Sequence, residues 1–123
     1  MSWKHFKHHE FSCKHCGENK MEDSFVDKLD ALREECGFPL RLTSAYRCPE
    51  HNMRVSTTGP DGPHTTGRAV DIAVRGPQAY RVVALAAKHG FTGIGVHQKG
   101  AVRFIHLDDL FPPLHPRPNV WSY

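Results

Sequence analysis

The chain has 123 residues, of which 39% are hydrophobic and 24% charged, as expected for one globular domain with its own core. Its formal net charge of +3 is small and its basic residues are scattered, which disfavours nucleic acid as a partner. No apolar run approaches the roughly 18 residues that a membrane span needs, and the basic start, residues 1–10, lacks the apolar region of a signal peptide. We therefore expect a single, monomeric domain over residues 1–123, made in the cytoplasm.

The first third of the chain predicts an irregular segment, a helix and a strand. Residues 1–20 show no regular pattern, whereas a helix is predicted from Asp23 to Gly37. Its apolar residues recur at the spacing of one helical face: Phe25, Leu29, Leu32 and Cys36. Asp23 or Ser24 can cap the start of this helix, and Gly37 can end it. Residues 40–44 alternate and are rich in β-forming side chains, which predicts a strand.

The middle of the chain predicts a second strand followed by a helix. In the strand, residues 68–74, alternation separates an apolar face from the face that carries Asp71. Pro77 is suited to the first turn of a helix, which runs to about His89. The predicted buried stripe of that helix consists of four residues: Tyr80, Val83, Ala84 and Ala87.

The last third predicts a hairpin and a tail. Residues 93–98 and 102–108 have the pattern of two strands joined at Lys99 and Gly100, which predicts a two-residue turn. The proline-rich tail, residues 111–123, is expected to wrap the surface and to be pinned by its aromatic side chains. One hairpin without a strict strand–helix–strand repeat predicts an α+β fold, with a mainly antiparallel sheet and helices packed on one face.

Four cysteines occur without an export signal, so disulfides are not expected. Cys13 and Cys16, followed by Gly17, have the spacing of half a zinc knuckle. Cys36 and Cys48 do not form a second such pair. Buried or idle thiols are the more common state of such residues, and a structural metal site remains an alternative.

Ten residues are histidines, an unusually large number for a common metal ligand. A loop carries His64, and the strand that follows carries Asp71 on its open face. Alternation also places His106 and Asp108 together on one face of a later strand. If the two strands are neighbours, His64, Asp71 and His106 converge with an open fourth position, which is the composition of a catalytic zinc site. The same spacings also fit three residues with separate structural roles.

Four segments occur in the order and spacing of one known family: SAYRCPEHN at 44–52, PHTTGRAVD at 63–71, GIGV at 93–96 and FIHLD at 104–108. Together they resemble the zinc D-Ala-D-Ala carboxypeptidase family, which comprises M15-like peptidases of bacterial peptidoglycan and phage endolysins. The opening around residues 10–13 and the ending at 116–121 resemble the short phage and bacterial branch. The resemblance spans nearly the whole chain and implies the fold shared by the Hedgehog signalling domain and these DD-peptidases.

The resemblance also implies an activity and the residues that perform it. It implies that His64, Asp71 and His106 bind one zinc ion, which activates a water nucleophile and polarises the scissile carbonyl. Arg47 is implied to bind the carboxylate of the substrate or the reaction intermediate. The implied substrates are peptidoglycan stem peptides, cut next to D-amino acids by a carboxypeptidase or by an endopeptidase of the L-Ala-D-Glu type. Such an enzyme would reach the cell wall after release from the cell, or as part of a phage particle.

The chain departs from the family at two positions. Gly62 stands where the family often has Ser, so a hydrogen bond beside the first ligand is expected to be lost. Arg103 stands where many relatives carry a general base, and arginine cannot serve because it stays protonated. The two-residue turn would place His97 roughly 13 Å from His106 along the strand, too far for direct proton transfer, and leaves it as a substrate-binding candidate. Asp108, roughly 7 Å away by the same rise, is the catalytic candidate, either as the base or as the group that orients a ligand.

The missing base at position 103 keeps a second function open. A relative without this base could retain its zinc as a structural element or as part of a cell-wall-binding module. Hydrolysis by the purified protein separates that alternative from the peptidase.

Overall fold

The computed structural model describes residues 3–56 and 59–123, so residues 1 and 2 of the predicted irregular start lie outside it. Its elements, in chain order, are η1 (His8–Phe11), α1 (Asp23–Cys36), β1 (Leu42–Ser44), α2 (Pro49–Val55), η2 (Gly59–Asp61), η3 (Pro63–Thr66), β2 (Ala69–Ile72), α3 (Gly76–Ala86), β3 (Gly93–His97), β4 (Phe104–Asp108) and β5 (Asn119–Ser122), where η denotes a short 3-10 helix. None of the described helices has the length and apolar character needed to cross a membrane.

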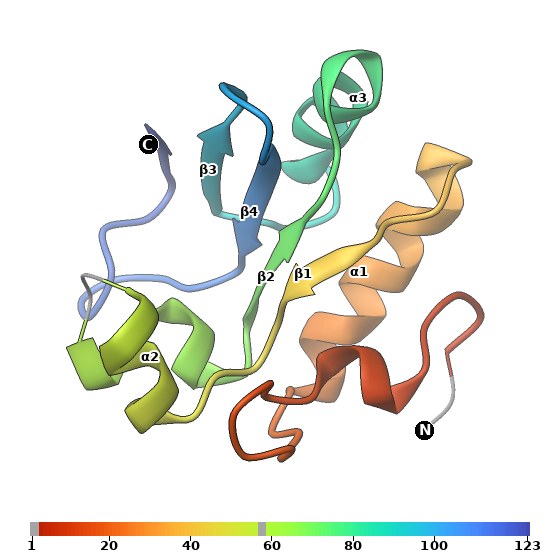
Figure 1. The fold of residues 1–123 in the computed structure, drawn as a ribbon. Coiled ribbons are helices and arrows are strands. Elements are labelled where there is room, and N and C mark those ends of the chain that lie inside the picture. The colour runs from red at the N-terminus through yellow and green to blue at the C-terminus, as the bar shows by residue number, and fades with distance from the viewer. Residues whose placement is uncertain (1–2, 57–58) are drawn as a thin grey trace.

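The strands form one five-stranded sheet in the order β1-β2-β4-β3-β5 (Figure 1). All neighbouring pairs are antiparallel except β3 and β5, which run parallel. The central pair, β2 and β4, places Asp71 directly opposite His106. The predicted α+β fold with a mainly antiparallel sheet is therefore confirmed.

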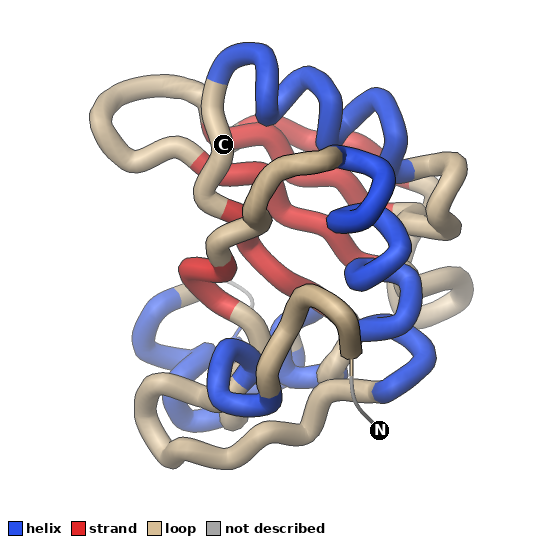
Figure 2. Tube along the Cα trace, turned by 90° about the vertical axis from the view of Figure 1, so that its right-hand side faces the viewer, coloured by secondary structure: helices blue, strands red, loops and turns tan. Residues whose placement is uncertain are grey.

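Helices α1 and α3 lie along the same face of the sheet (Figure 2). The predicted apolar face of α1 is fully buried, and the helix ends at Gly37 in the left-handed conformation, with φ of 80°. Opposite it, the apolar residues of β2 and β4 complete the core: Val70, Ile72, Ile105 and Leu107. Because the helices cover one face, the polar residues of β2 and β4 are available on the other.

The predicted stripe of α3 is wrong. Tyr80 is 78% exposed, and the buried side of the helix instead carries Ala79, Val82 and Ala86. The small alanine side chains let the helix approach the core closely, while Arg81 donates a hydrogen bond to the carbonyl of Cys36 at the end of α1. Packing against α1, rather than the largest apolar side chains, sets the rotation of α3.

The predicted two-residue turn between β3 and β4 is also wrong. His97 pairs with Phe104, so the connection comprises residues 98–103. Gln98 stabilises this longer loop, because its side-chain amide donates to the carbonyls of Val74 and Phe104. The register therefore brings His97 two positions closer to His106 than the shorter turn would.

The tail returns to the sheet instead of only wrapping the surface. Its last part forms β5 beside β3, with Trp121 opposite Gly95 (Figure 1). The tail thereby contributes side chains to the face of the sheet that the helices leave open.

Candidate metal centre and active site

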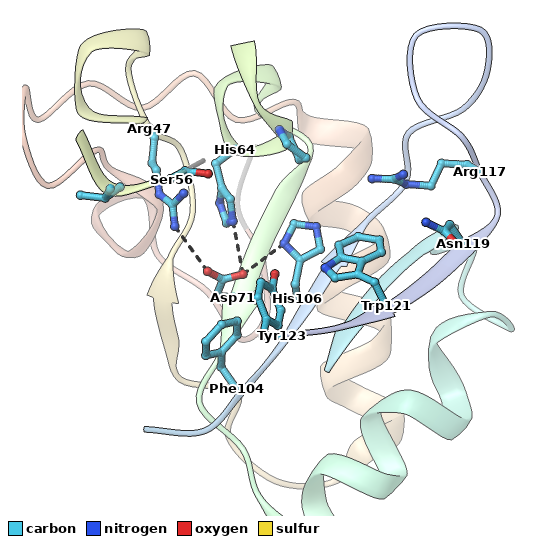
Figure 3. Close-up of a pocket in the computed structure, with 12 residues that line it drawn as sticks. Arg47, Ser56, His64, Asp71, Phe104, His106, Arg117, Asn119, Trp121 and Tyr123 are labelled. Atoms are coloured by element: carbon cyan, nitrogen blue, oxygen red, sulfur yellow. Dashed lines mark hydrogen bonds and ion pairs between the residues drawn. The ribbon is translucent and has the colours of Figure 1, made fainter. Parts of the chain in front are cut away.

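Three side chains from separate elements meet on the open face of the sheet. His64 comes from η3, Asp71 from β2 and His106 from β4. Asp71 Oδ1 lies 3.2 Å from His64 Nε2 and 3.1 Å from His106 Nδ1 (Figure 3). One ligand atom from each residue lies within 4.8 Å of the others, and all three residues are buried. Their convergence is the arrangement that strand alternation predicted.

Gly67 makes the approach of His64 possible. It connects η3 to β2 in the left-handed conformation, with φ of 76°. A Cβ at this position would collide with the backbone carbonyl of Lys20, so the turn also needs the absence of a side chain. The turn leads directly into β2, which places Asp71 beside the preceding histidine.

Both imidazoles are fixed by a hydrogen bond on the nitrogen that points away from Asp71. His64 Nδ1 donates to the carbonyl of Ala45 at 2.8 Å, and His106 Nε2 donates to Asp108 Oδ2 at 2.8 Å. Such bonds select the ring tautomer and are typical of histidines that bind metal. The donor set, two imidazoles and one carboxylate, fits zinc. Gly62 has no side chain that could bind His64, and the carbonyl of Ala45 accepts a hydrogen bond from that histidine instead.

The charges of the cluster favour an ionised Asp71. Burial would raise the pKa of this carboxyl, but the neighbouring His64 and His106 outweigh burial and lower it well below its usual range. Burial would likewise lower the pKa of His106, but hydrogen bonds to Asp108 and Asp71 raise it. A carboxylate held between two imidazoles thus attracts positive charge to this point.

Asp108 is fully buried behind His106 and is held from three sides. Arg117 binds it with two parallel hydrogen bonds of 2.9 and 2.8 Å, and the backbone N–H of Leu110 donates a third. Burial would raise the pKa of this carboxyl, but His106 and Arg117 lower it well below its usual range. Gly93, directly opposite in β3, leaves the space that the carboxylate fills. These contacts place Asp108 on the far side of the ring from Asp71.

The three converging residues line a cavity of about 590 Å³. The described residues that line it come from six segments: Arg47, Val55, Ser56, Pro63, His64, Asp71, Phe104, His106, Arg117, Asn119, Trp121 and Tyr123. Figure 3 shows Trp121 beside His106, with Tyr123 and Phe104 on another side of Asp71. The cavity therefore combines a polar floor with aromatic walls.

Arg47 is held in place at the edge of this cavity. Its Nε donates to Ser44 Oγ at 3.0 Å, and one terminal nitrogen donates to Asn52 Oδ1 at 3.1 Å. The other terminal nitrogen lies 3.5 Å from Asp71 Oδ2. Two neutral partners thus fix the guanidinium in a position where it also forms an ion pair with Asp71, one of the candidate ligands.

Trp121 packs against His106, with ring centroids 5.1 Å apart. The guanidinium carbon of Arg117 lies over the indole ring, 5.0 Å from its centroid. A Cβ at Gly95 would lie 2.6 Å from the indole nitrogen, so this glycine admits the ring. Sequence reasoning missed the roles of Arg117, Trp121 and Tyr123. For Arg117 and Trp121 the available signal was the likeness of residues 116–121 to the short family branch. For Tyr123 it was the expectation that aromatic side chains pin the tail to the surface.

His97 and Arg103 do not line the cavity. The ring of His97 stacks on Phe104 at 5.0 Å and contacts Tyr123, so it lies behind two residues that do line it. Arg103 donates to the carbonyl of Gly100 within the loop. The sulfur atoms of Cys13, Cys16 and Cys48 form a second, separate group.

The sequence is similar to a known protein family. No curated protein matches the chain. The family model described as Peptidase M15 matches residues 4–108, a range that includes Arg47 and all three converging residues. The chain belongs to the peptidase M15 family.

Proposed function

We propose that the protein is a zinc-dependent peptidoglycan peptidase that hydrolyses peptide bonds next to D-amino acids in stem peptides. One observation carries the proposal: the donor atoms of His64, Asp71 and His106 meet on the floor of a cavity large enough for a short peptide. Membership of the peptidase M15 family supports it. The proposed site of action is the cell wall, reached after release from the cell or in a phage particle.

The ligands of the zinc ion would be His64 Nε2, the Asp71 carboxylate and His106 Nδ1. When bound there, zinc supplies Lewis acidity toward a peptide carbonyl and activates water. Asp108 acts through His106: its carboxylate accepts a hydrogen bond from Nε2–H, which keeps the proton on Nε2 and leaves the lone pair of Nδ1 free to bind the metal. We therefore propose the orienting role for Asp108, because its contacts hold it away from the cavity.

Arg47 is the proposed group that binds the substrate. A guanidinium binds a carboxylate through two parallel hydrogen bonds, and Ser44 and Asn52 fix its direction before the substrate arrives. If Arg47 binds the free C-terminus of a stem peptide, the enzyme is a carboxypeptidase. If it stabilises the charge that develops on the carbonyl oxygen, the enzyme can also cut within the peptide.

A zinc-containing relative that binds the cell wall without cutting it is the second candidate. Among the described residues that line the cavity, the only carboxylate is Asp71, which is itself a proposed ligand. This observation favours the second candidate, because a general base is then supplied by none of the usual side chains.

The test combines metal analysis with a digest of purified peptidoglycan, read by mass spectrometry of the released fragments. His106→Ala is expected to lower the zinc content by about one ion per chain and to abolish hydrolysis. The matched control is His9→Ala, because His9 is exposed and is not among the residues that line the cavity. Full hydrolysis by metal-free protein would refute the peptidase mechanism, and zinc binding without any hydrolysis would support the second candidate.

A further inference from the structure

Three of the four cysteines form a cluster that the proposed function does not use. The sulfur atoms of Cys13, Cys16 and Cys48 all lie within 4.8 Å of one another, although Cys48 is far from the others in sequence. Two sulfur atoms that share a tetrahedral zinc ion lie about 3.8 Å apart, given Zn–S bonds of about 2.3 Å. The cluster joins the N-terminal segment to the start of α2, where Figure 1 shows the red and yellow parts of the chain approaching each other.

The backbone around the cluster has the shape of a metal-binding knuckle. The loop from Cys13 closes with a hydrogen bond from the N–H of Gly17 to the carbonyl of Cys13 at 2.8 Å. Gly17 has φ of 77°, the left-handed conformation that ends such a loop. The spacing predicted half a knuckle here, and the fold adds a third sulfur to it.

Backbone N–H groups point at the sulfur atoms. The N–H of Cys48 donates to Cys13 Sγ at 3.3 Å, and the N–H of His51 donates to Cys48 Sγ at 3.4 Å. Hydrogen bonds from N–H donors stabilise the thiolate, which is the form that binds metal.

Two histidines lie near Cys48, the third cysteine of the cluster. His15 Nδ1 lies 3.4 Å from Cys48 Sγ, and the His51 ring stacks on the His15 ring with centroids 5.9 Å apart. A sulfur and a nitrogen that share a tetrahedral zinc ion lie about 3.6 Å apart. His51 also follows Cys48 by three residues on the first turn of α2, so the pattern is C-x2-C followed by C-x2-H.

We propose that Cys13, Cys16 and Cys48 bind a second zinc ion, with one histidine of the stacked pair, His15 or His51, as the fourth ligand. Three thiolates and one imidazole form a closed set, which is typical of structural rather than catalytic zinc. This site shares no residue with the candidate active site and does not depend on whether the protein hydrolyses peptides. All four cysteines are free thiols, and three mutually close sulfur atoms are not accounted for by one disulfide.

The position of the cluster indicates what a second zinc ion would stabilise. Cys48 directly follows Arg47 and caps the start of α2, the helix that carries Asn52, a partner of that arginine. A metal held there fixes this segment to the N-terminal part of the chain. We expect it to contribute to the free energy of folding, because such a site does not exist in the unfolded chain.

The test measures zinc per chain after purification under reducing conditions, with Cys36→Ala as the matched control. Cys16 is exposed, so Cys16→Ser removes one ligand with little effect on packing, whereas Cys36 lies in the core outside the cluster. The wild-type protein should hold about two zinc ions, Cys16→Ser and His106→Ala about one each, and the double variant about none. Cys36→Ala should retain about two.

Cobalt substitution distinguishes this site from the first one. Cobalt bound by thiolates gives an intense sulfur-to-metal charge-transfer absorption, which His106→Ala should preserve and Cys16→Ser should abolish. A wild-type content of about one zinc ion, lost in His106→Ala but unchanged in Cys16→Ser, together with no such absorption, would overturn the proposal. If the wild-type protein holds about one metal ion, gives the sulfur absorption with cobalt and loses no metal in His106→Ala, the proposed function is refuted and the cysteine site stands.

The fourth ligand is identified by His15→Ala and His51→Ala in competition with a chelator. The variant that loses the ligand should release the second zinc ion more readily, while the other should behave as the wild type. If both variants retain it as tightly as the wild type, the histidine part of the proposal is wrong.

Discussion

Asp108→Asn separates orientation of a ligand from proton transfer. The carboxylate is fully buried, accepts one hydrogen bond from His106 and two from Arg117, and the side chain of Arg117 is only 6% exposed. The Asn amide has one acceptor oxygen, and its NH2 group would face N–H donors that now bind the second carboxylate oxygen. The amide is also neutral, so Arg117 loses its charged partner. Removing one member of a buried ion pair costs about 3 kcal/mol or more in the free energy of unfolding. A weakened hydrogen bond to a metal-binding histidine lowers metal affinity by about 10–100-fold.

The assay for this prediction has two parts. Chelator competition measures zinc affinity at the His106 site, and hydrolysis by protein saturated with zinc measures turnover. We expect weaker affinity with nearly normal turnover at saturation. Normal affinity with turnover lowered by about 10²–10⁴-fold would refute the orienting role and identify Asp108 as the base. The double variant Asp108→Asn, Arg117→Gln should recover part of the lost stability without recovering zinc affinity, because it removes the unpaired buried charge.

Three further predictions concern the cavity and the core. Arg47→Ala should lower kcat/KM by roughly 10–150-fold with zinc retained, and Arg47→Lys should keep only part of the activity because lysine lacks the two parallel donors. Arg54→Ala, an exposed control on α2, should have no effect. Equal losses on substrates with free and with amidated C-termini would show that Arg47 stabilises the intermediate. Gly93→Ala should lower the urea-unfolding free energy by about 3 kcal/mol, because the Cβ displaces the buried carboxylate of Asp108; an unchanged unfolding midpoint would contradict this packing. Leu29→Ala should cost about 2–5 kcal/mol by the same measurement, since its side chain is fully buried, and a loss below about 1 kcal/mol would contradict its place in the core.

The parts of the fold that local sequence determines were predictable. The helix from Asp23 to Cys36 has its apolar spacing and its terminal Gly37 within one short segment. The predicted cap at its start was wrong: Glu22 occupies the N-cap position, and its side chain makes no capping hydrogen bond. The convergence of His64, Asp71 and His106 required only alternation in two strands and the assumption that they are neighbours. Their binding of zinc stays a prediction, since geometry brings the donors together without identifying the ion.

The remaining features depend on contacts between distant segments. The register of β3 and β4 follows from a loop that Gln98 stabilises through the carbonyl of Val74, which belongs to another part of the chain. The partner of Asp108 is Arg117, and no local pattern distinguishes this arginine from a surface residue. Cys48 likewise has no cysteine partner in its own segment and meets Cys13 only after the N-terminal segment packs beside α2.

The order of the strands has a consequence for how the protein reaches its folded state. β2 and β4 are adjacent in the sheet, but α3 and β3 lie between them in the chain. The donors of the candidate active site therefore meet only after a long loop has closed, a step that slows folding relative to local contacts. Until then the unfolded chain offers ten histidines and four cysteines to any zinc present, in combinations that the fold does not use. Refolding with the metal added last should consequently yield more active protein than refolding in excess zinc.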